Sequence, residues 1–278
     1  MSQQLVAIKK RIKSVTGAYK VTSAMKLVST VKLKRWREKM LTNKAYFDEL
    51  SMIADEILGY CEDVDSPYLS LNKDSKKNLY IIVSSNLGLC AAYNNNIFRF
   101  ADEIVTKEDD LIILGKKGIN HFGDFVNQID TTLYSSNIDV NLVKDITEYC
   151  IKNFENKTYR SVHIIHSRYK NSLNFIPTDF KLLPLNKIKA EVDKIPPILE
   201  PSKEKLVRDL IEFYLKGVIN SKLLESEVCE QAARSNAMEN ATDNAKDILD
   251  DLNIQFNKAR QGAITDEIIE IVAASKGV

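Results

Sequence analysis

The distribution of proline is the feature that most limits how this chain can fold. All six prolines lie between positions 67 and 201, which leaves 66 proline-free residues before them and 77 after them. A proline inside a helix costs about 3 kcal/mol, because it lacks the backbone N–H and its ring clashes with the preceding turn. The sequence therefore permits one very long helix at each end and predicts a different organisation between them.

Apolar residues at both ends recur with the spacing of a coiled coil. In the first segment they step mostly by three and four residues, with a gap at Thr22, through Leu5, Ile8, Ile12, Val15, Tyr19, Met25, Val28, Leu33, Trp36, Met40, Phe47, Leu50, Ile53 and Ile57. In the last segment they follow Ala241, Ala245, Ile248, Leu252, Phe256, Ala259 and Ala263. A stripe this narrow is typical of a helix that packs against one partner helix.

The charges of the two end segments are complementary. Ten basic residues crowd the first segment before its first acid, Glu38: Lys9, Lys10, Arg11, Lys13, Lys20, Lys26, Lys32, Lys34, Arg35 and Arg37. Acids dominate the last segment: Glu225, Glu227, Glu230, Asp243, Asp247, Asp250 and Asp251. We expect the two helices to form an antiparallel coiled coil, held by its apolar seams because surface ion pairs contribute little.

The middle of the chain has the pattern of a small α/β domain. Short apolar runs rich in β-branched residues alternate with helical patterns, the runs at 79–85, 110–115 and 161–167 and the helices near 94–107, 116–123 and 139–154. Such alternation favours a mainly parallel, Rossmann-like sheet. A hairpin-like addition is expected at 173–185, and 186–203 reads as a linker. The expected fold is α/β with a long antiparallel coiled coil, divided into 1–60, 61–200 and 201–278.

Composition excludes several functional classes. A net charge of +1 predicts neither a nucleic-acid binder nor a protein with an acidic tail. The chain has no apolar run of membrane-spanning length, and because it has no secretory signal we expect it to stay in the cytoplasm. The four cysteines are scattered and have no metal-binding spacing, which predicts reduced core thiols. No Walker or dinucleotide glycine motif is present, and Gly115-Lys-Lys-Gly118 is more typical of a simple turn than of a phosphate site. We therefore expect no cofactor, no metal ion and no catalytic residue.

Two polar features suggest protein partners. The basic first helix could neutralise nucleic-acid phosphates, but its bases encircle a helix that carries a coiled-coil stripe, so a solvated face or an acidic protein partner is favoured. Arg260 and Gln261 in the last helix can donate hydrogen bonds to carboxylates or backbone groups of a partner. An ordinary solvated helix face is the competing interpretation.

Both ends of the chain resemble the gamma subunits of F-type ATPases. The segments RIKSVTGAYKVTSAMKLVSTVKLKR (11–35) and EQAARSNAMENATDNAKDILDDLNIQFNKARQGAITDEIIEIVAAS (230–275) are similar to the two terminal signatures of that family. The segment SSNLGLCAAYN (84–94) is a weaker match. Because these segments bracket the chain at the family's spacing, the resemblance covers essentially its whole length.

The resemblance implies a central stalk that rotates inside a ring of alternating alpha and beta subunits and transmits torque, while catalysis belongs to the partners. It implies that the α/β domain touches the epsilon subunit and the membrane-embedded c-ring, on the cytoplasmic face of a bacterial membrane, with no nucleic acid or small-molecule substrate. By position, Arg260 and Gln261 match residues that grip a loop of beta. Thr22, Met25 and Lys26 match the segment that faces an acidic lever of beta.

The segment 84–94 departs from the family pattern. Asn86 and Leu87 stand where most members have an aspartate and an arginine, and Ala91 and Ala92 stand where they have two glycines. The change removes a charge pair and alters which backbone conformations are easily reached. It keeps a second hypothesis open, in which the chain serves as a rotor subunit of a specialised F-type-like ATPase that does not make ATP.

Overall fold

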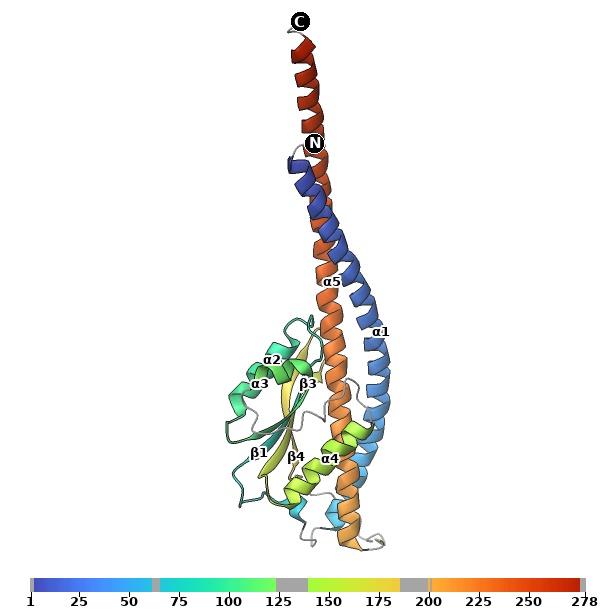
Figure 1. The fold of residues 1–278 in the computed structure, drawn as a ribbon. Coiled ribbons are helices and arrows are strands. Elements are labelled where there is room, and N and C mark those ends of the chain that lie inside the picture. Colours follow the sequence, from blue (N-terminus) through green and yellow to red (C-terminus); the bar gives the residue numbers. More distant parts are fainter. Residues whose placement is uncertain (1–2, 62–65, 124–139, 186–199, 201, 276–278) are drawn as a thin grey trace. The chain divides into compact units, whose positions relative to one another are not determined.

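Two very long helices occupy the two ends of the sequence. The computed structural model describes residues 3–61, 66–123, 140–185, 200 and 202–275. Helix α1 spans Gln3–Tyr60 and helix α5 spans Lys203–Ser275, 58 and 73 residues respectively (Figure 1). This confirms the two helices expected from the proline distribution. The expected linker falls on residues 186–199 and 201, which lie outside the described residues.

The contacts of the chain group it into two compact units. One unit joins residues 1–31 to residues 234–278, and the other comprises residues 32–233. Both boundaries fall inside the long helices, because these units follow contacts whereas the division expected from the sequence follows the ends of elements. Each unit is described separately below.

In the first unit, α1 and α5 form an antiparallel pair. Thr22, Lys26 and Thr30 of α1 contact, in that order, Thr242, Glu239 and Ser235 of α5, so the two sequences run in opposite directions. Besides Thr16, Ser23 and Met25, the shielded positions of α1 in this unit are the eight that we call the seam: Leu5, Ile8, Ile12, Val15, Tyr19, Thr22, Lys26 and Ser29. They step by three and four residues without interruption.

This seam differs from the predicted stripe at its polar positions. The expected gap at Thr22 is part of the seam, and Ser29 is buried where Val28 was expected, while Val28 is 55% exposed. On α5, Thr242 and Leu249 are shielded in place of the expected Ile248. The prediction followed hydrophobicity alone. The packing instead keeps a constant heptad phase, which places hydroxyl groups inside the pair.

In the second unit, four strands form one sheet. They are β1 (Asn78–Val83), β2 (Asp110–Leu114), β3 (Ser161–Tyr169) and β4 (Phe175–Leu183). Their order is β2-β1-β3-β4, with β1 parallel to both neighbours and β4 antiparallel to β3. The three expected strands, the mainly parallel sheet and the hairpin-like addition are confirmed.

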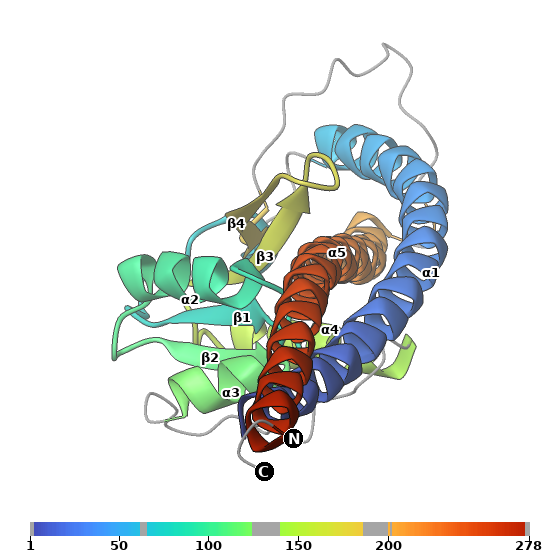
Figure 2. The ribbon, with the colours of Figure 1, turned by 90° about the horizontal axis from the view of Figure 1, so that it is seen from above.

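Helices cover both faces of this sheet (Figure 2). They are α2 (Tyr93–Ile104), α3 (Lys116–Phe122) and α4 (Val140–Glu155), and a 3-10 turn lies at Pro67–Leu69. Along β1, Ile81 packs into a core with α4 and α5, and the adjacent Ile82 packs into a core with α2 and α3. Successive side chains of β1 point to opposite faces, and both faces are covered. This explains the continuous apolar run of the strand.

The first half of α5 belongs to the α/β unit, which sequence reasoning did not anticipate. Its apolar residues Val207, Ile211, Leu215, Val218, Ile219 and Leu223 are buried in the core formed with α4 and the sheet. The predicted coiled-coil stripe began only at Ala241, so these earlier residues were not assigned. The four cysteines are buried and form no disulfide, as predicted.

Candidate partner-binding sites

The predicted contact residue Thr22 faces the inside of the helix pair. Its hydroxyl oxygen lies 2.9 Å from that of Thr242 and donates to the backbone carbonyl of Tyr19 at 3.1 Å. The hydroxyl of Thr242 is also 2.6 Å from the carbonyl oxygen of Met238. Both hydroxyls are therefore satisfied within the pair, and the two threonines form a polar layer between apolar ones.

Lys26 forms an ion pair that joins the two helices. Its ammonium lies 2.7 Å from Glu239 Oε1, and the two side chains are 38% and 49% exposed. The hydrogen bond to Glu239, together with the nearby charge of Asp243, raises the pKa of Lys26 against a smaller opposing effect of burial. A partner carboxylate would have to share or displace this contact. Met25, the neighbouring residue, is half-buried.

Arg260 and Gln261 lie on the exposed face of α5. Neither side chain has a hydrogen-bond or ion-pair partner in the part of the chain that the structure describes. The antiparallel register places them level with the beginning of α1 at Gln3. They are thus separated along the pair from Thr22, Met25 and Lys26. The five residues form two sites instead of one.

The last turns of α5 extend past the beginning of α1 and carry exposed apolar side chains. Five residues there are between 46% and 69% exposed: Ile264, Ile268, Ile269, Ile271 and Val272. Large aliphatic side chains clustered at one helix end are unusual on a free surface, and exposed apolar patches are common where one protein binds another. These apolar residues are visible in the sequence, but the predicted stripe ended at Ala263, so they were not assigned to a contact surface.

The glycine turn at 115–118 is filled by the protein itself. The backbone N–H groups of Lys116, Lys117 and Gly118 donate to Asn86 Oδ1, the carbonyl of Ser85 and Ser84 Oγ respectively. A phosphate at this helix N-terminus would need these same donors. The three N–H groups already have acceptors within the chain, which agrees with the interpretation as a simple turn. The side-chain oxygen of Asn86 accepts the hydrogen bond from Lys116, and an aspartate carboxylate at the same position could accept it too.

The loop after β1 presents two leucines to solvent. Leu87 and Leu89 are 64% and 60% exposed. Leu89 and Ala91 have positive φ angles of 62° and 48°, a conformation that non-glycine residues rarely adopt. Asn94 stabilises the loop: its side chain accepts a hydrogen bond from the backbone N–H of Ser85 and donates one to the Ser85 hydroxyl. The substitution of the family arginine thus leaves an apolar side chain on a well-fixed loop.

Comparisons with known proteins agree with this architecture. The profile of the family described as ATP synthase matches residues 4–278. The "ATP synthase gamma chain" of Clostridium botulinum is 35% identical over 99% of this chain and 98% of its own length. The protein of the same name from Mycoplasma mobile is 34% identical over 98% of both chains.

Solved structures share the fold. A chain of the central stalk and c-ring of the Tetrahymena thermophila mitochondrial ATP synthase matches with a TM-score of 0.59 and 22% identity, over 80% of this chain and 99% of that one. A chain of the Euglena gracilis mitochondrial ATP synthase matches with a TM-score of 0.55 and 21% identity, over 89% and 95%. None of the helices in the described ranges is long and apolar enough to cross a membrane.

Proposed function

Because this chain belongs to the ATP synthase gamma-chain family, we propose that it is the rotating shaft that couples ion flow through a membrane ring to ATP synthesis or hydrolysis in an alpha/beta head. The chain is a non-catalytic subunit of the ATP synthase complex. It transmits torque, and the chemistry takes place in its partners. The coupling ion of the proposal is the proton.

The observation that carries the proposal is the antiparallel pair of α1 and α5 with its exposed apolar end. A shaft needs two helices packed against each other, and the seam provides this packing over residues 5–29 of α1. It also needs a surface that a surrounding ring can hold. The aliphatic residues between Ile264 and Val272 are suited to a ring whose inner surface is apolar, since burying them would remove a large apolar area from water.

The beta subunit is the proposed partner of the two polar sites. Arg260 and Gln261 have unused donors that fit a loop with carboxylates or backbone carbonyls. At Lys26 the proposed contact with beta depends on the ion pair with Glu239. An acidic segment of beta would have to compete with Glu239 for the ammonium of Lys26. Met25 and Thr22 would contribute shape at that site, since the hydroxyl of Thr22 already bonds inside the pair.

The epsilon subunit and the c-ring are the proposed partners of the α/β unit, on the cytoplasmic face of a bacterial membrane. The segments 1–60, 61–200 and 201–278 remain our division of the chain into shaft, α/β domain and shaft. The alternative role in a specialised motor that does not make ATP is not favoured, because the relatives carry the name of the ATP synthase gamma chain. Asn86 and Leu87 then mark a local variation within that role.

Co-expression with the cognate alpha and beta subunits tests the proposal. The complex is purified through a tag on beta, and ATPase activity is measured with and without this chain. We expect stable co-purification and an activity that depends on the chain. The double variant Arg260→Ala/Gln261→Ala should assemble less tightly and transmit less torque against a load. The exposed pair Asn257→Ala/Lys258→Ala is a matched control on the same helix. Failure of the wild-type chain to assemble would overturn the assignment.

A further inference from the structure

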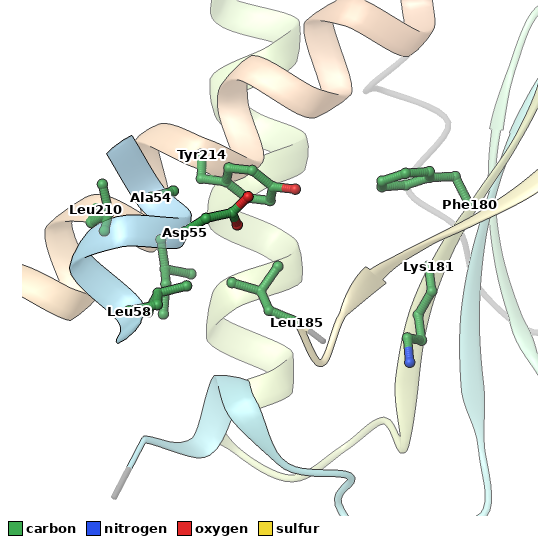
Figure 3. A pocket seen from close by; sticks show the side chains of 9 residues that line it. Ala54, Asp55, Leu58, Phe180, Lys181, Leu185, Leu210 and Tyr214 are labelled. Atoms are coloured by element: carbon green, nitrogen blue, oxygen red, sulfur yellow. The ribbon is translucent and has the colours of Figure 1, made fainter. Parts of the chain in front are cut away.

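A small pocket in the α/β unit contains an acid, Asp55, that is paired with no cation of the described residues. Its volume is about 100 Å³, and it lies between the end of α1, the first half of α5 and strand β4 (Figure 3). Its lining consists of Ala54, Asp55, Leu58, Phe180, Lys181, Leu185, Leu210, Ile211 and Tyr214. All these residues belong to the same compact unit. Most of the walls are therefore aliphatic or aromatic, and Asp55 is the one acid among them.

We propose that this pocket is a socket for a single basic side chain, lysine or arginine, presented by another subunit of the ATP synthase complex. The inference rests on the proposed function only in naming the source of that side chain. The carboxylate of Asp55 would bind the cationic head, and the apolar walls would pack against the methylene stem, as long basic side chains commonly bury their stems.

The state of Asp55 supports this reading. Its side chain is half-buried, and burial is what raises the pKa of its carboxyl above the ordinary value. No hydrogen bond or ion pair to Asp55 is found in the described ranges of the chain. A partly desolvated carboxylate without a counter-charge is unfavourable, and a cation from outside would relieve that cost.

The neighbouring basic residues are committed elsewhere. Arg208 pairs with Glu155 at 3.2 Å, and Lys216 pairs with Glu212 on its own helix. Lys181 lines the pocket, but its ammonium points away from Asp55 (Figure 3). The described part of the unit therefore supplies no cation to the acid.

The dimensions and chemistry of the pocket select the kind of guest. A metal ion would need several oxygen ligands, and Asp55 is the only carboxylate in the lining. A volume near 100 Å³ accommodates one side chain and is smaller than the roughly 300–1,000 Å³ of pockets for drug-sized ligands. One basic side chain of a partner polypeptide fits both limits.

Zero-length cross-linking of the complete complex tests the socket. A carbodiimide couples a carboxylate to a lysine amine in direct contact, and the linked peptides are identified by mass spectrometry. We expect a link between Asp55 and a lysine of another subunit, which disappears in Asp55→Asn. A link from Asp55 to a lysine of this same chain would overturn the proposal, because the acid would then be paired internally.

Dissociation of subunits from the complex covers an arginine guest, which the carbodiimide does not couple. For Asp55→Asn we expect one subunit to dissociate about tenfold faster than in the wild type, as expected when a charged partner is lost. Asp55→Lys should lose that subunit altogether. Asp209→Asn, an exposed acid on α5 outside the pocket, is the matched control and should behave like the wild type. Wild-type dissociation rates in both Asp55 variants, with no link to another subunit, would refute the socket.

The same complexes separate this proposal from the proposed function. If the wild-type chain does not assemble with alpha and beta, the function itself fails. If it assembles and supports ATPase activity while the Asp55 variants match the wild type, only the socket fails.

Discussion

The hydroxyl oxygens of Thr22 and Thr242 lie 2.9 Å apart, inside a helix pair whose other layers are mostly apolar. In coiled coils a polar layer fixes the register at some cost in stability. Here the cost is small, because each hydroxyl also contacts a carbonyl of its own helix. The layer thus aligns α1 with α5 where an aliphatic seam alone would allow sliding.

Replacing these threonines by the isosteric valine separates the hydrogen bond from packing. We expect Thr22→Val and Thr242→Val each to lower the free energy of unfolding by about 1 kcal/mol, the usual net value of one hydrogen bond. The double variant should lose less than the sum, since neither hydroxyl is then left facing an apolar group. Urea unfolding followed by helical circular dichroism gives the four values. Strict additivity would contradict an energetic link between the two residues.

Glu239→Gln tests whether Lys26 is held back from a partner. The variant removes the ion pair, so Lys26 is released while the fold is kept. If an acidic segment of beta binds Lys26, assembly with alpha and beta should tighten in Glu239→Gln and weaken in Lys26→Gln. Titration of the chain into the alpha/beta head at two salt concentrations measures both effects. Weaker assembly in Glu239→Gln would show that the partner binds the intact ion pair instead.

The two glycines after β2 are required by close packing. A Cβ at Gly118 would lie 2.6 Å from Ser84 Oγ and 2.7 Å from Ile113 Cγ2, and a Cβ at Gly115, where φ is 104°, would lie 2.2 Å from the carbonyl oxygen of Ser84. We expect Gly115→Ala to destabilise the α/β unit by about 3 kcal/mol or more, because clash and backbone strain add. Gly17→Ala is the control. It has open space around it inside α1, so helix propensity should stabilise that variant by about 1 kcal/mol.

Ala91 has a backbone conformation that favours glycine. At a φ of 48° an alanine pays a steric cost that glycine avoids, so Ala91→Gly should stabilise the chain by about 1 kcal/mol. Ala92 has a φ of −82°, and Ala92→Gly should be neutral or slightly destabilising. Thermal unfolding of the two variants side by side provides the measurement. Destabilisation by Ala91→Gly would mean that the methyl group has a packing role that outweighs the strain.

The sequence predicted most of the fold, because its helical segments were long and its strand segments were separated by clear breaks. Proline-free ends gave the helices, and β-branched runs gave the strands. It failed where burial depends on partners far along the chain. Ser29 is buried while Val28 is exposed, since the heptad phase continues through polar residues. The segment from Val207 to Leu223 contributes core residues to the α/β unit. Only the folded structure shows that they pack against α4 and the sheet. Asp55 gave no signal at all, because a single acid at a helix end is ordinary until a pocket forms around it.

Two acids of the α/β unit should respond to pH in opposite directions. Glu225 accepts a hydrogen bond from the backbone N–H of Tyr169 at 3.0 Å and lies 3.3 Å from Nε2 of the buried His166. Burial pushes the pKa of Glu225 up, but His166, the Tyr169 N–H and Lys222 outweigh it, and the pKa falls below the ordinary value. Its stabilising effect is therefore present above the pKa of the unfolded chain and is lost as the pH falls through the folded pKa.

For Asp55 the sign is reversed, because burial raises its pKa with no compensating contact. The carboxyl favours folding while protonated, and that advantage is lost as the pH rises through its folded pKa. In the isolated chain, Asp55→Asn should therefore increase the free energy of unfolding at pH 7 and change it little near pH 3, whereas Glu225→Gln should decrease it at pH 7 by about 2 kcal/mol and less in acid. Urea unfolding at both pH values measures the four differences. A loss of stability in Asp55→Asn at pH 7 would show that the carboxylate already has a cation within this chain, and the socket would then have no vacant charge to offer a partner.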